Sequence, residues 1–236
     1  MPPEILGQVY EQFLGEVIRL IGHKAIVEEK PAVKKAGGVY YTPSYIVQHI
    51  VDGTLGKILA EKTPVQISAA DRQQKDAVPL RIIDPACGSG SFLMHVYQKL
   101  LDWYRERYVA DGPEKYTRGA EPKLYQSDKR EWRLTIAERR RILLTHIYGV
   151  DVDAQAVEVT KLSLLLKVLE GESGDALARQ MDIFHLRALP DLGENIRCGN
   201  SLIGIDFFTS YSRALFPEDD LFLGSTRLTG QTNSRF

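Results

Sequence analysis

A ten-residue run of mostly small side chains joins a short apolar segment to an amphipathic one. It reads Asp84-Pro85-Ala86-Cys87-Gly88-Ser89-Gly90-Ser91-Phe92-Leu93. A glycine-rich turn at the start of a helix lets a ligand touch the backbone, and the free amides of the first helical turn favour a carboxylate or a phosphate. The run is therefore a candidate turn for binding a nucleotide or a nucleotide-like ligand.

Three classes of nucleotide site use such a turn, and the residues around Gly90 separate them. A phosphate-binding loop requires a lysine after its last glycine, but Ser91 and Phe92 follow Gly90, which excludes that class. The dinucleotide fingerprint would put Leu93 where a third small residue belongs, which disfavours that class. Asp84 can instead meet a cationic group, and S-adenosylmethionine offers an ammonium, a carboxylate and a sulfonium without needing a pyrophosphate site.

Strand and helix patterns alternate around this turn. Buried strands are expected at Leu80–Asp84, His146–Asp151 and Ile196–Cys198, and helices from Ser91 to Tyr104 or beyond and from Ala154 to Leu169, the second capped by Asp153. Such alternation predicts an α/β fold with a parallel sheet and right-handed crossovers.

The flanking segments predict further elements. Apolar residues at helical spacing favour an amphipathic helix over Ile5–Ile21, and Thr42 suits the N-cap of a second helix that begins at Pro43 and ends near Leu59. The segments 63–79 and 111–129 are typical of loops, and a helix is expected over 131–144. Its three arginines, Arg139 to Arg141, allow two interpretations, a phosphate-contacting patch or a solvated helix face, of which the solvated face is favoured.

Composition narrows the class of protein. With 236 residues, 44% hydrophobic content and a net charge of -1, the chain suits one main domain and lacks the basic surplus of a self-sufficient nucleic-acid binder. The two cysteines, Cys87 and Cys198, point to a reducing compartment, and Cys87 is better read as a buried filler than as a nucleophile. The chain shows no signal peptide, membrane span or metal-ligand spacing, so we expect a cytoplasmic protein without a metal site.

Taken together, four motifs in order resemble those of S-adenosylmethionine-dependent DNA adenine-N6 methyltransferases, particularly the large single-chain restriction-modification and phage-defence type. They are Tyr40-Tyr41-Thr42-Pro43, the run from Asp84 to Leu93, Gly149-Val150-Asp151-Val152-Asp153 and Cys198-Gly199-Asn200-Ser201-Leu202. Tyr10 to Gly15 is similar to the helical lead-in of such enzymes. The resemblance implies a three-layer, Rossmann-like class I methyltransferase fold, present here as its N-terminal half with a mostly parallel sheet.

The resemblance also implies three domains and a set of contacts to S-adenosylmethionine. A helical arm would cover residues 1–37, the cofactor-binding core 38–210 and an extended tail 211–236. Tyr41, Thr42 and Pro43 would close over the methionine part of the cofactor, with the Thr42 hydroxyl on its carboxylate. Asp84 and the backbone of 86–90 would hold the amino-acid end.

Further roles follow from the same resemblance. Phe92 would support the turn from behind, and Asp151 would accept hydrogen bonds from both ribose hydroxyls, as a strand-end acid does in dinucleotide-binding folds. Val152 would lie against the adenine ring, and Asn200 with the Ser201 amide would read the adenine edge. In nucleotide-binding folds the strand-end acid stands about 20 residues after the glycine turn. Asp151 stands further along the chain because 108–132 resembles an insertion. Asp102 and Asp111 are nearer the expected spacing but follow no strand, so Asp151 is preferred.

In this family the target adenine is held by an Asn/Asp-Pro-Pro-aromatic segment, whereas the Pro-Pro pair in this chain, Pro2-Pro3, follows Met1. We therefore expect the cofactor-binding portion of a restriction or defence methyltransferase, inactive by itself and meeting double-stranded DNA mainly through a recognition domain absent here. The first strand is expected to expose an unpaired edge. The alternatives are a methyltransferase acting on RNA or on protein glutamine, and a non-catalytic interaction module that retains the fold.

Overall fold

The computed structural model describes residues 6–7, 9–10, 16–21, 24–29, 42–69, 78–119, 121–127, 129–171 and 190–203. It divides the chain into two units, Met1–Asn200 and Ser201–Phe236. In the second unit the described residues, 201–203, include a turn. The predicted boundaries of the arm, core and tail stay predictions.

A parallel three-stranded sheet lies at the centre of the first unit. Its strands are β3 (Ile82–Asp84), β6 (Ile147–Asp151) and β7 (Ile196–Cys198), in the order β3-β6-β7. Asp84 pairs with Gly149 in register, and Asp151 pairs with Cys198. The predicted parallel sheet is confirmed, and its register places the two acidic strand ends at the same edge.

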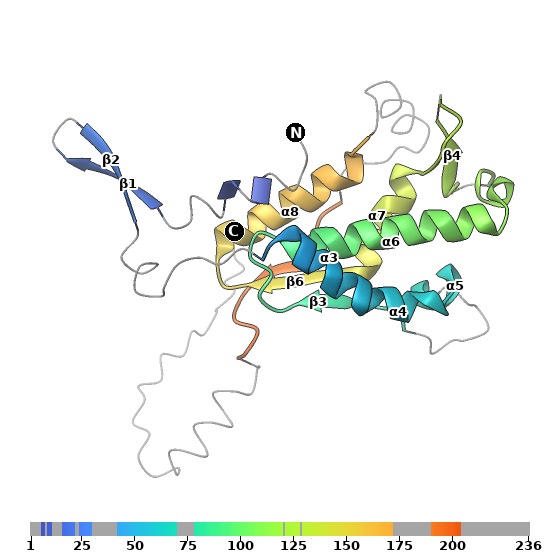
Figure 1. Ribbon diagram of the computed structural model, residues 1–236, viewed down its shortest axis with the longest axis horizontal. Helices are drawn as coiled ribbons and strands as arrows, with labels where there is room; N and C mark the ends of the chain where they lie inside the picture. Colours follow the sequence, from blue (N-terminus) through green and yellow to red (C-terminus); the bar gives the residue numbers. More distant parts are fainter. Residues whose placement is uncertain are drawn as a thin grey trace, which may run out of the picture. The chain divides into compact units, whose positions relative to one another are not determined.

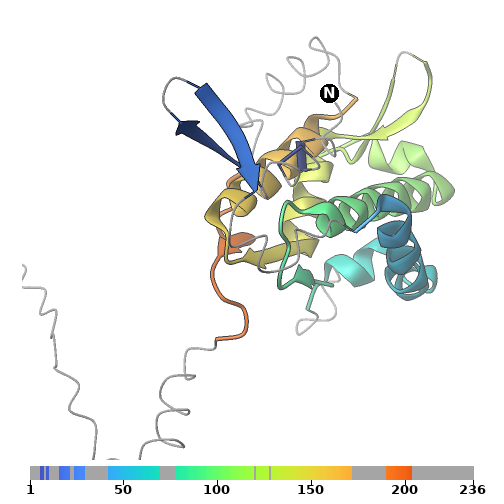
Figure 2. The same cartoon turned by 60° about the vertical axis from the view of Figure 1, so that its left-hand side comes forward.

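Long helices connect these strands and cover one side of the sheet. They are α6 (Ser91–Ala110), α7 (Ile136–His146) and α8 (Ala154–Leu169), and both views draw α6 and α8 on the same side (Figures 1 and 2). The core between them includes the fully buried side chains of Tyr97, Tyr104, Leu143 and Leu164. In Figure 1 both α6 and α8 begin at the end of the sheet toward which β3 and β6 point.

The other side of the sheet is more open among the described residues. Ile83, whose side chain alternates with those of Ile82 and Asp84, is 62% exposed. In the described part of the chain β3 pairs with β6 alone, so its other edge has no strand partner there. The described residues include one helical layer of the expected three-layer arrangement, and the unpaired edge of the first strand stays a prediction.

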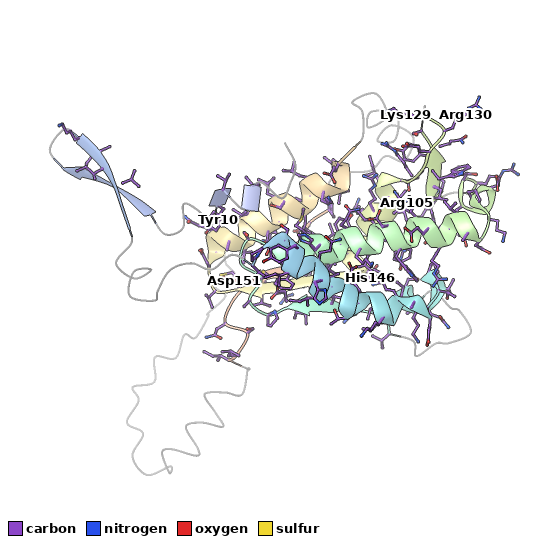
Figure 3. All side chains as sticks on the ribbon, in the orientation of Figure 1. Tyr10, Arg105, Lys129, Arg130, His146 and Asp151 are labelled. Carbon is purple, nitrogen blue, oxygen red and sulfur yellow. The ribbon has the colours of Figure 1, made fainter. Side chains whose placement is uncertain are left out.

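A buried histidine fixes the starts of two strands. His146 Nδ1 lies 2.6 Å from the Leu80 carbonyl oxygen, and its Nε2 lies 2.8 Å from the Tyr104 hydroxyl. Because a carbonyl only accepts, Nδ1 carries the proton and Nε2 accepts from Tyr104. Burial lowers the pKa of His146 below its ordinary value of 6.5. His146 and Asp151 stand at the two ends of β6 (Figure 3), so the buried network is separate from the end where the strands' acids lie.

The helix predicted over Ile5–Ile21 is wrong in its second half. Residues 6–7 and 9–10 are helical, but β1 (Glu16–Ile21) pairs antiparallel with β2 (Lys24–Glu29). The β-branched residues of this segment favour strands, and the two-residue connection that begins with Gly22 is a hairpin signal. The helical interpretation of the arm therefore fails for Glu16–Ile21 and Lys24–Glu29.

A second hairpin replaces part of an expected loop and helix. β4 (Leu124–Gln126) pairs with β5 (Trp132–Leu134), and α7 begins after them at Ile136. Arg130, with φ 61°, lies in the connection. The Thr135 side chain accepts the Glu138 N–H, so Thr135 is the N-cap of α7. The 3-10 turn η1 (Pro113–Tyr116) precedes this hairpin.

The helices before β3 differ in detail from the expectation. α3 (Ser44–Gly53) starts one residue later than predicted, with Pro43 rather than Thr42 as N-cap, and it ends before α4 (Leu55–Ala60). A short α5 (Pro64–Ser68) stands in the expected loop because Thr63 and Gln66 form a capping box. None of the helices in the described ranges is long and apolar enough to cross a membrane.

Candidate functional site

The glycine-rich run forms a tight turn between β3 and α6, as predicted. Gly88 and Gly90 have φ values of 53° and 86°, the left-handed region that favours glycine. The Gly90 N–H donates to the Cys87 carbonyl at 2.8 Å, and the Ala86 N–H donates to Asp84 Oδ1 at 3.1 Å. The backbone therefore reverses within a few residues and starts α6 directly from the strand end.

Asp151 joins the end of β6 to this turn. Its Oδ2 accepts the Gly88 N–H at 2.7 Å, and its Oδ1 accepts the Asp153 N–H at 2.9 Å. The Cys87 N–H also donates to the Val150 carbonyl at 3.0 Å. Each carboxylate oxygen has a second lone pair, so Asp151 retains acceptor capacity for ligand hydroxyls while it holds the turn.

Burial and a neighbouring acid disfavour the charge of Asp84. Burial raises the pKa of the Asp84 carboxyl, the Ala86 N–H lowers it, and the nearby Asp151 raises it again. No further hydrogen bond reaches Asp84 from the residues that the structure describes. The corner is thus anionic and incompletely solvated, and a cationic ligand group would relieve the repulsion between the two carboxylates.

Cys87 is a packing residue in this turn. Its side chain is 5% exposed, and burial, followed by the charges of Asp84 and Asp151, raises its pKa to about 12. A thiol that stays protonated is a poor nucleophile, which agrees with the reading of Cys87 as a filler. A Cβ placed on Gly149 would lie 3.0 Å from the Cys87 sulfur and 2.8 Å from Leu93 Cδ1, so only glycine fits there without movement.

The remaining turn residues divide into exposed and packed ones. Pro85 and Ala86 are exposed, and Val152, just beyond Asp151, is 71% exposed. Phe92 is partly buried and packs against the core. The described residues therefore leave the Val152 side chain accessible to a ligand, while Phe92 lies on the core side of the turn.

Comparison with known proteins identifies the family. Residues 63–216 match the model of the MmeI DNA-methyltransferase domain. The chain belongs to this methyltransferase family. It is also 31% identical over 202 residues to the type II restriction enzyme and methyltransferase RM.Eco57I of Escherichia coli. It is 30% identical over 229 residues to the putative type II restriction enzyme and methyltransferase RM.MjaORFECS2P of Methanocaldococcus jannaschii.

These relatives are much longer than the chain. The two alignments cover 85% and 86% of this chain but 18% and 16% of the relatives. The adenine-specific methyltransferase BrxX of Escherichia coli is 25% identical over 186 residues, which are 69% of this chain and 13% of that protein. The predicted resemblance to large restriction-modification and phage-defence methyltransferases is therefore confirmed.

Within the MmeI-family match lie the turn, Asp151 and the residues that follow β7. The Gly199 N–H donates to the Asp151 carbonyl oxygen at 2.8 Å, which brings the fourth motif to the end of β6. Asn200 is exposed beside it. Ser201 belongs to the second unit, so its pairing with Asn200 stays a prediction.

The first motif lies upstream of the MmeI-family match. Tyr41 lies outside the described residues, whereas Thr42 and Pro43 lead into α3. In Figure 1 α3 begins at the same end of the sheet as α6, against which it packs. The contact of Tyr41, Thr42 and Pro43 with a cofactor stays a prediction.

Three contacts to the site were not foreseen from the spacing of the residues. The Tyr10 hydroxyl donates to Asp153 Oδ2 at 2.8 Å, and a Cβ on Gly7 would lie 3.1 Å from Ser89 Oγ. The Thr160 hydroxyl, on α8, donates to the Gly88 carbonyl at 2.8 Å. The lead-in motif around Tyr10 was a signal for the first contact, but nothing in the local pattern singled out Thr160.

The arginines of α7 have structural partners. Arg139 donates to the carbonyls of Val168 and Glu170, at 3.2 and 2.7 Å, and thus ties α7 to the end of α8. Arg141 donates two hydrogen bonds, from Nε and Nη2, to the buried Glu138 carboxylate. The favoured interpretation of a solvated face is wrong for Arg139 and Arg141, because both guanidinium groups satisfy buried or partly buried acceptors.

The acids passed over in favour of Asp151 have local partners. Asp102, on α6, pairs with Arg105, and Asp111, at the end of α6, pairs with Lys115. Two surface grooves along α6 contain Asp102, but none of the predicted cofactor residues lines them. The structure thus brings Asp151, and neither alternative acid, to the glycine turn.

Proposed function

We propose that this chain binds S-adenosylmethionine at the turn between β3 and α6. The observation that carries the proposal is that Asp84 and Asp151, which end two adjacent parallel strands, both bind amides of the glycine turn, Asp84 that of Ala86 and Asp151 that of Gly88. In open parallel sheets, ligands bind beyond the carboxyl ends of the strands. We further propose that the fold is the Rossmann-like class I methyltransferase fold, in which this corner is the cofactor crevice.

The donor and acceptor groups present suit this cofactor. The run 84–93 contains no lysine or arginine, and its two neighbouring carboxylates would repel a phosphate. An ammonium, by contrast, gains from Asp84, and ribose hydroxyls find the remaining lone pairs of Asp151. The exposed Val152 offers an apolar contact for an adenine ring, and Asn200 offers an amide to its edge.

The chain's own residues would bind and orient, and the cofactor when bound would supply the methyl group on its sulfonium. Tyr41, Thr42 and Pro43 would close over the methionine part. Asp84 would hold the amino group, Asp151 would fix the ribose, and the glycines would let the backbone approach. Exact placement of the sulfonium matters because alignment with the acceptor accounts for a large share of the rate in transfer reactions.

We propose that the whole protein is a DNA adenine-N6 methyltransferase of a restriction or phage-defence system. The names of the relatives support this, as two are restriction enzymes and methyltransferases and one is an adenine-specific methyltransferase. The 236 residues contain no Asn/Asp-Pro-Pro-aromatic segment. We therefore expect no transfer of radiolabelled methyl to duplex DNA by these residues alone, and incorporation above a no-enzyme control would refute that expectation.

Calorimetric titration of the chain with S-adenosylmethionine tests the proposed site. Asp151→Ala removes both a ligand acceptor and the partner of the Gly88 N–H, and hydrogen bonds to a charged group contribute about 1.5–3 kcal/mol each. We expect Kd to rise by about tenfold to a hundredfold, and Gly88→Leu to abolish binding because the turn cannot carry a large side chain at positive φ.

Asp102→Ala is the matched control, since Asp102 is an acid on α6 that pairs with Arg105 away from the turn. Its Kd should equal that of the unmodified chain. Absence of binding by the unmodified chain, or an Asp151→Ala variant that binds as well as the control, would contradict the proposed site.

A further inference from the structure

Thr160 is a buried helical residue whose hydroxyl serves a distant turn. It lies within α8 and is 0% exposed. Threonines inside helices commonly hydrogen-bond the carbonyl one turn back in the same helix. The Thr160 hydroxyl instead donates to the carbonyl of Gly88, 72 residues earlier in the chain, at 2.8 Å. The buried hydroxyl of this helix therefore binds the glycine turn and not its own helix.

The Gly88 residue is held at both of its backbone polar groups. Its N–H donates to Asp151 Oδ2 at 2.7 Å, and its carbonyl accepts from Thr160. One partner comes from the end of β6 and the other from α8, which follows that strand. Two hydrogen bonds from separate elements leave the Gly88 backbone little freedom to rotate.

The turn also rests directly on the Thr160 side chain. A Cβ on Gly90 would lie 2.8 Å from both Thr160 Cγ2 and Thr160 Oγ1. Nothing larger than glycine fits between them without movement, so the threonine sets how closely the turn approaches α8. Both parts of the side chain contribute, the hydroxyl to Gly88 and the methyl group to the surface beneath Gly90.

We propose that Thr160 is a positioning residue that shapes the turn before any ligand arrives. The inference deepens the proposed cofactor site and rests on it for the identity of the ligand. A backbone that already has its binding conformation loses less conformational freedom on binding, so a preorganised turn binds more tightly. Thr160 binds the Gly88 carbonyl and would act on the amino-acid end of S-adenosylmethionine through the Gly88 peptide.

Two substitutions separate the hydroxyl from the methyl group. Thr160→Val keeps the shape of the side chain and leaves the Gly88 carbonyl without its donor, whereas Thr160→Ser keeps the donor and removes the methyl group. In titrations with S-adenosylmethionine we expect Kd to rise about tenfold in the valine variant and to stay within about threefold in the serine variant. A residue that serves only as packing would show the opposite order.

Exchange of the Gly88 amide proton, followed by NMR without ligand, provides a second readout. Gly88 N–H should exchange faster in Thr160→Val than in the unmodified chain, and Thr160→Ser should restore slow exchange, because local opening of the turn sets this rate. If the unmodified chain does not bind S-adenosylmethionine, the proposed function fails, while the exchange comparison still decides whether Thr160 positions the turn.

Thr54→Val is the matched control. Thr54 Oγ1 donates at 2.7 Å to the Ile50 carbonyl, the ordinary bond to the preceding helical turn, at an exposed site. This variant should leave both Kd and Gly88 exchange unchanged. Should Thr160→Val fail to fold, Thr160→Ala and Thr160→Ser make the same comparison, since both lack the methyl group and differ only in the hydroxyl. Equal Kd values and equal exchange rates in the compared pair would overturn the proposal.

Discussion

At the scale of single residues, the central feature is a carboxylate whose ionised form lowers the stability of the folded protein without ligand. Asp84 is half-buried at the end of β3, and its pKa is raised by burial and by Asp151. An ionised group that the fold disfavours but a cation favours is typical of a binding residue rather than of a structural one. The same residue should therefore affect stability and binding in opposite directions.

Asp84→Asn tests this opposition. The amide oxygen can still accept the Ala86 N–H, but the charge is gone. Because the folded-state pKa lies above the ordinary 3.8, the unfolded chain holds fewer protons than the folded one at intermediate pH, and ionisation of Asp84 lowers stability as pH rises. At pH 7 we expect a higher melting temperature than in the unmodified chain, and a gain that shrinks as pH falls toward 3.8.

Binding of S-adenosylmethionine to the same variant should weaken by about tenfold to a hundredfold through loss of a charged partner. Asp102→Asn, which removes an exposed ion pair with Arg105, should change neither property appreciably. An Asp84→Asn variant that binds the cofactor as tightly as the Asp102→Asn control would remove Asp84 from the proposed site.

At the scale of elements, the turn depends on how closely α6 and β6 approach. A Cβ on Gly149 would stand 2.8 Å from Leu93 Cδ1 and 3.0 Å from the Cys87 sulfur. Leu93 and Cys87 are both buried, at 1% and 5% exposure, so neither can turn away into solvent. The strand must carry glycine for the first turn of α6 to pack on it.

Gly149→Ala should therefore lower the free energy of unfolding by about 1–3 kcal/mol, the usual cost of overpacking a core. Gly53→Ala is the matched substitution: Gly53 ends α3 with no atom within 4 Å of the added methyl group, and should stabilise by about 0.5–1 kcal/mol. Urea unfolding monitored by circular dichroism measures both. A Gly149→Ala chain as stable as Gly53→Ala would show that this packing is not tight.

The elements that the sequence predicted well are those with a single consistent signal. Ala154–Leu169 has a capping aspartate and a long apolar periodicity, and β3 is bounded by Pro85 and the glycines. The segment Glu16–Ile21 lacked such a signal, because six residues with adjacent apolar positions fit a helix and a strand equally well. The three-residue strands β4 and β5 are too short to show any period.

The residues of the candidate site also differ in how far the sequence predicted them. Asp84 and Asp151 were predictable because both follow strands, and parallel strands bring their carboxyl ends to one edge. The hydrogen bonds of Thr160 to Gly88 and of Tyr10 to Asp153 could not be read from residue spacing, because they join residues 72 and 143 positions apart; a resemblance in the lead-in motif was the one signal for Tyr10. Side chains that support a site from another element leave no local pattern in the sequence.

At the scale of the whole molecule, net charge and length favour a role in cofactor binding over one in DNA recognition. The 30 basic and 31 acidic residues nearly cancel, so the chain offers no general attraction to the DNA backbone. It spans less than a fifth of the length of the two restriction enzymes and methyltransferases that it resembles. We propose that target recognition belongs to segments outside these 236 residues, and that this chain supplies the cofactor corner.

The most direct measurement is a crystal structure of the chain soaked with S-adenosylmethionine. The account predicts ligand density beyond the carboxyl ends of β3 and β6, with the amino group at Asp84 and the ribose at Asp151. Density in the grooves along α6, or a turn that remains empty at saturating ligand, would contradict it.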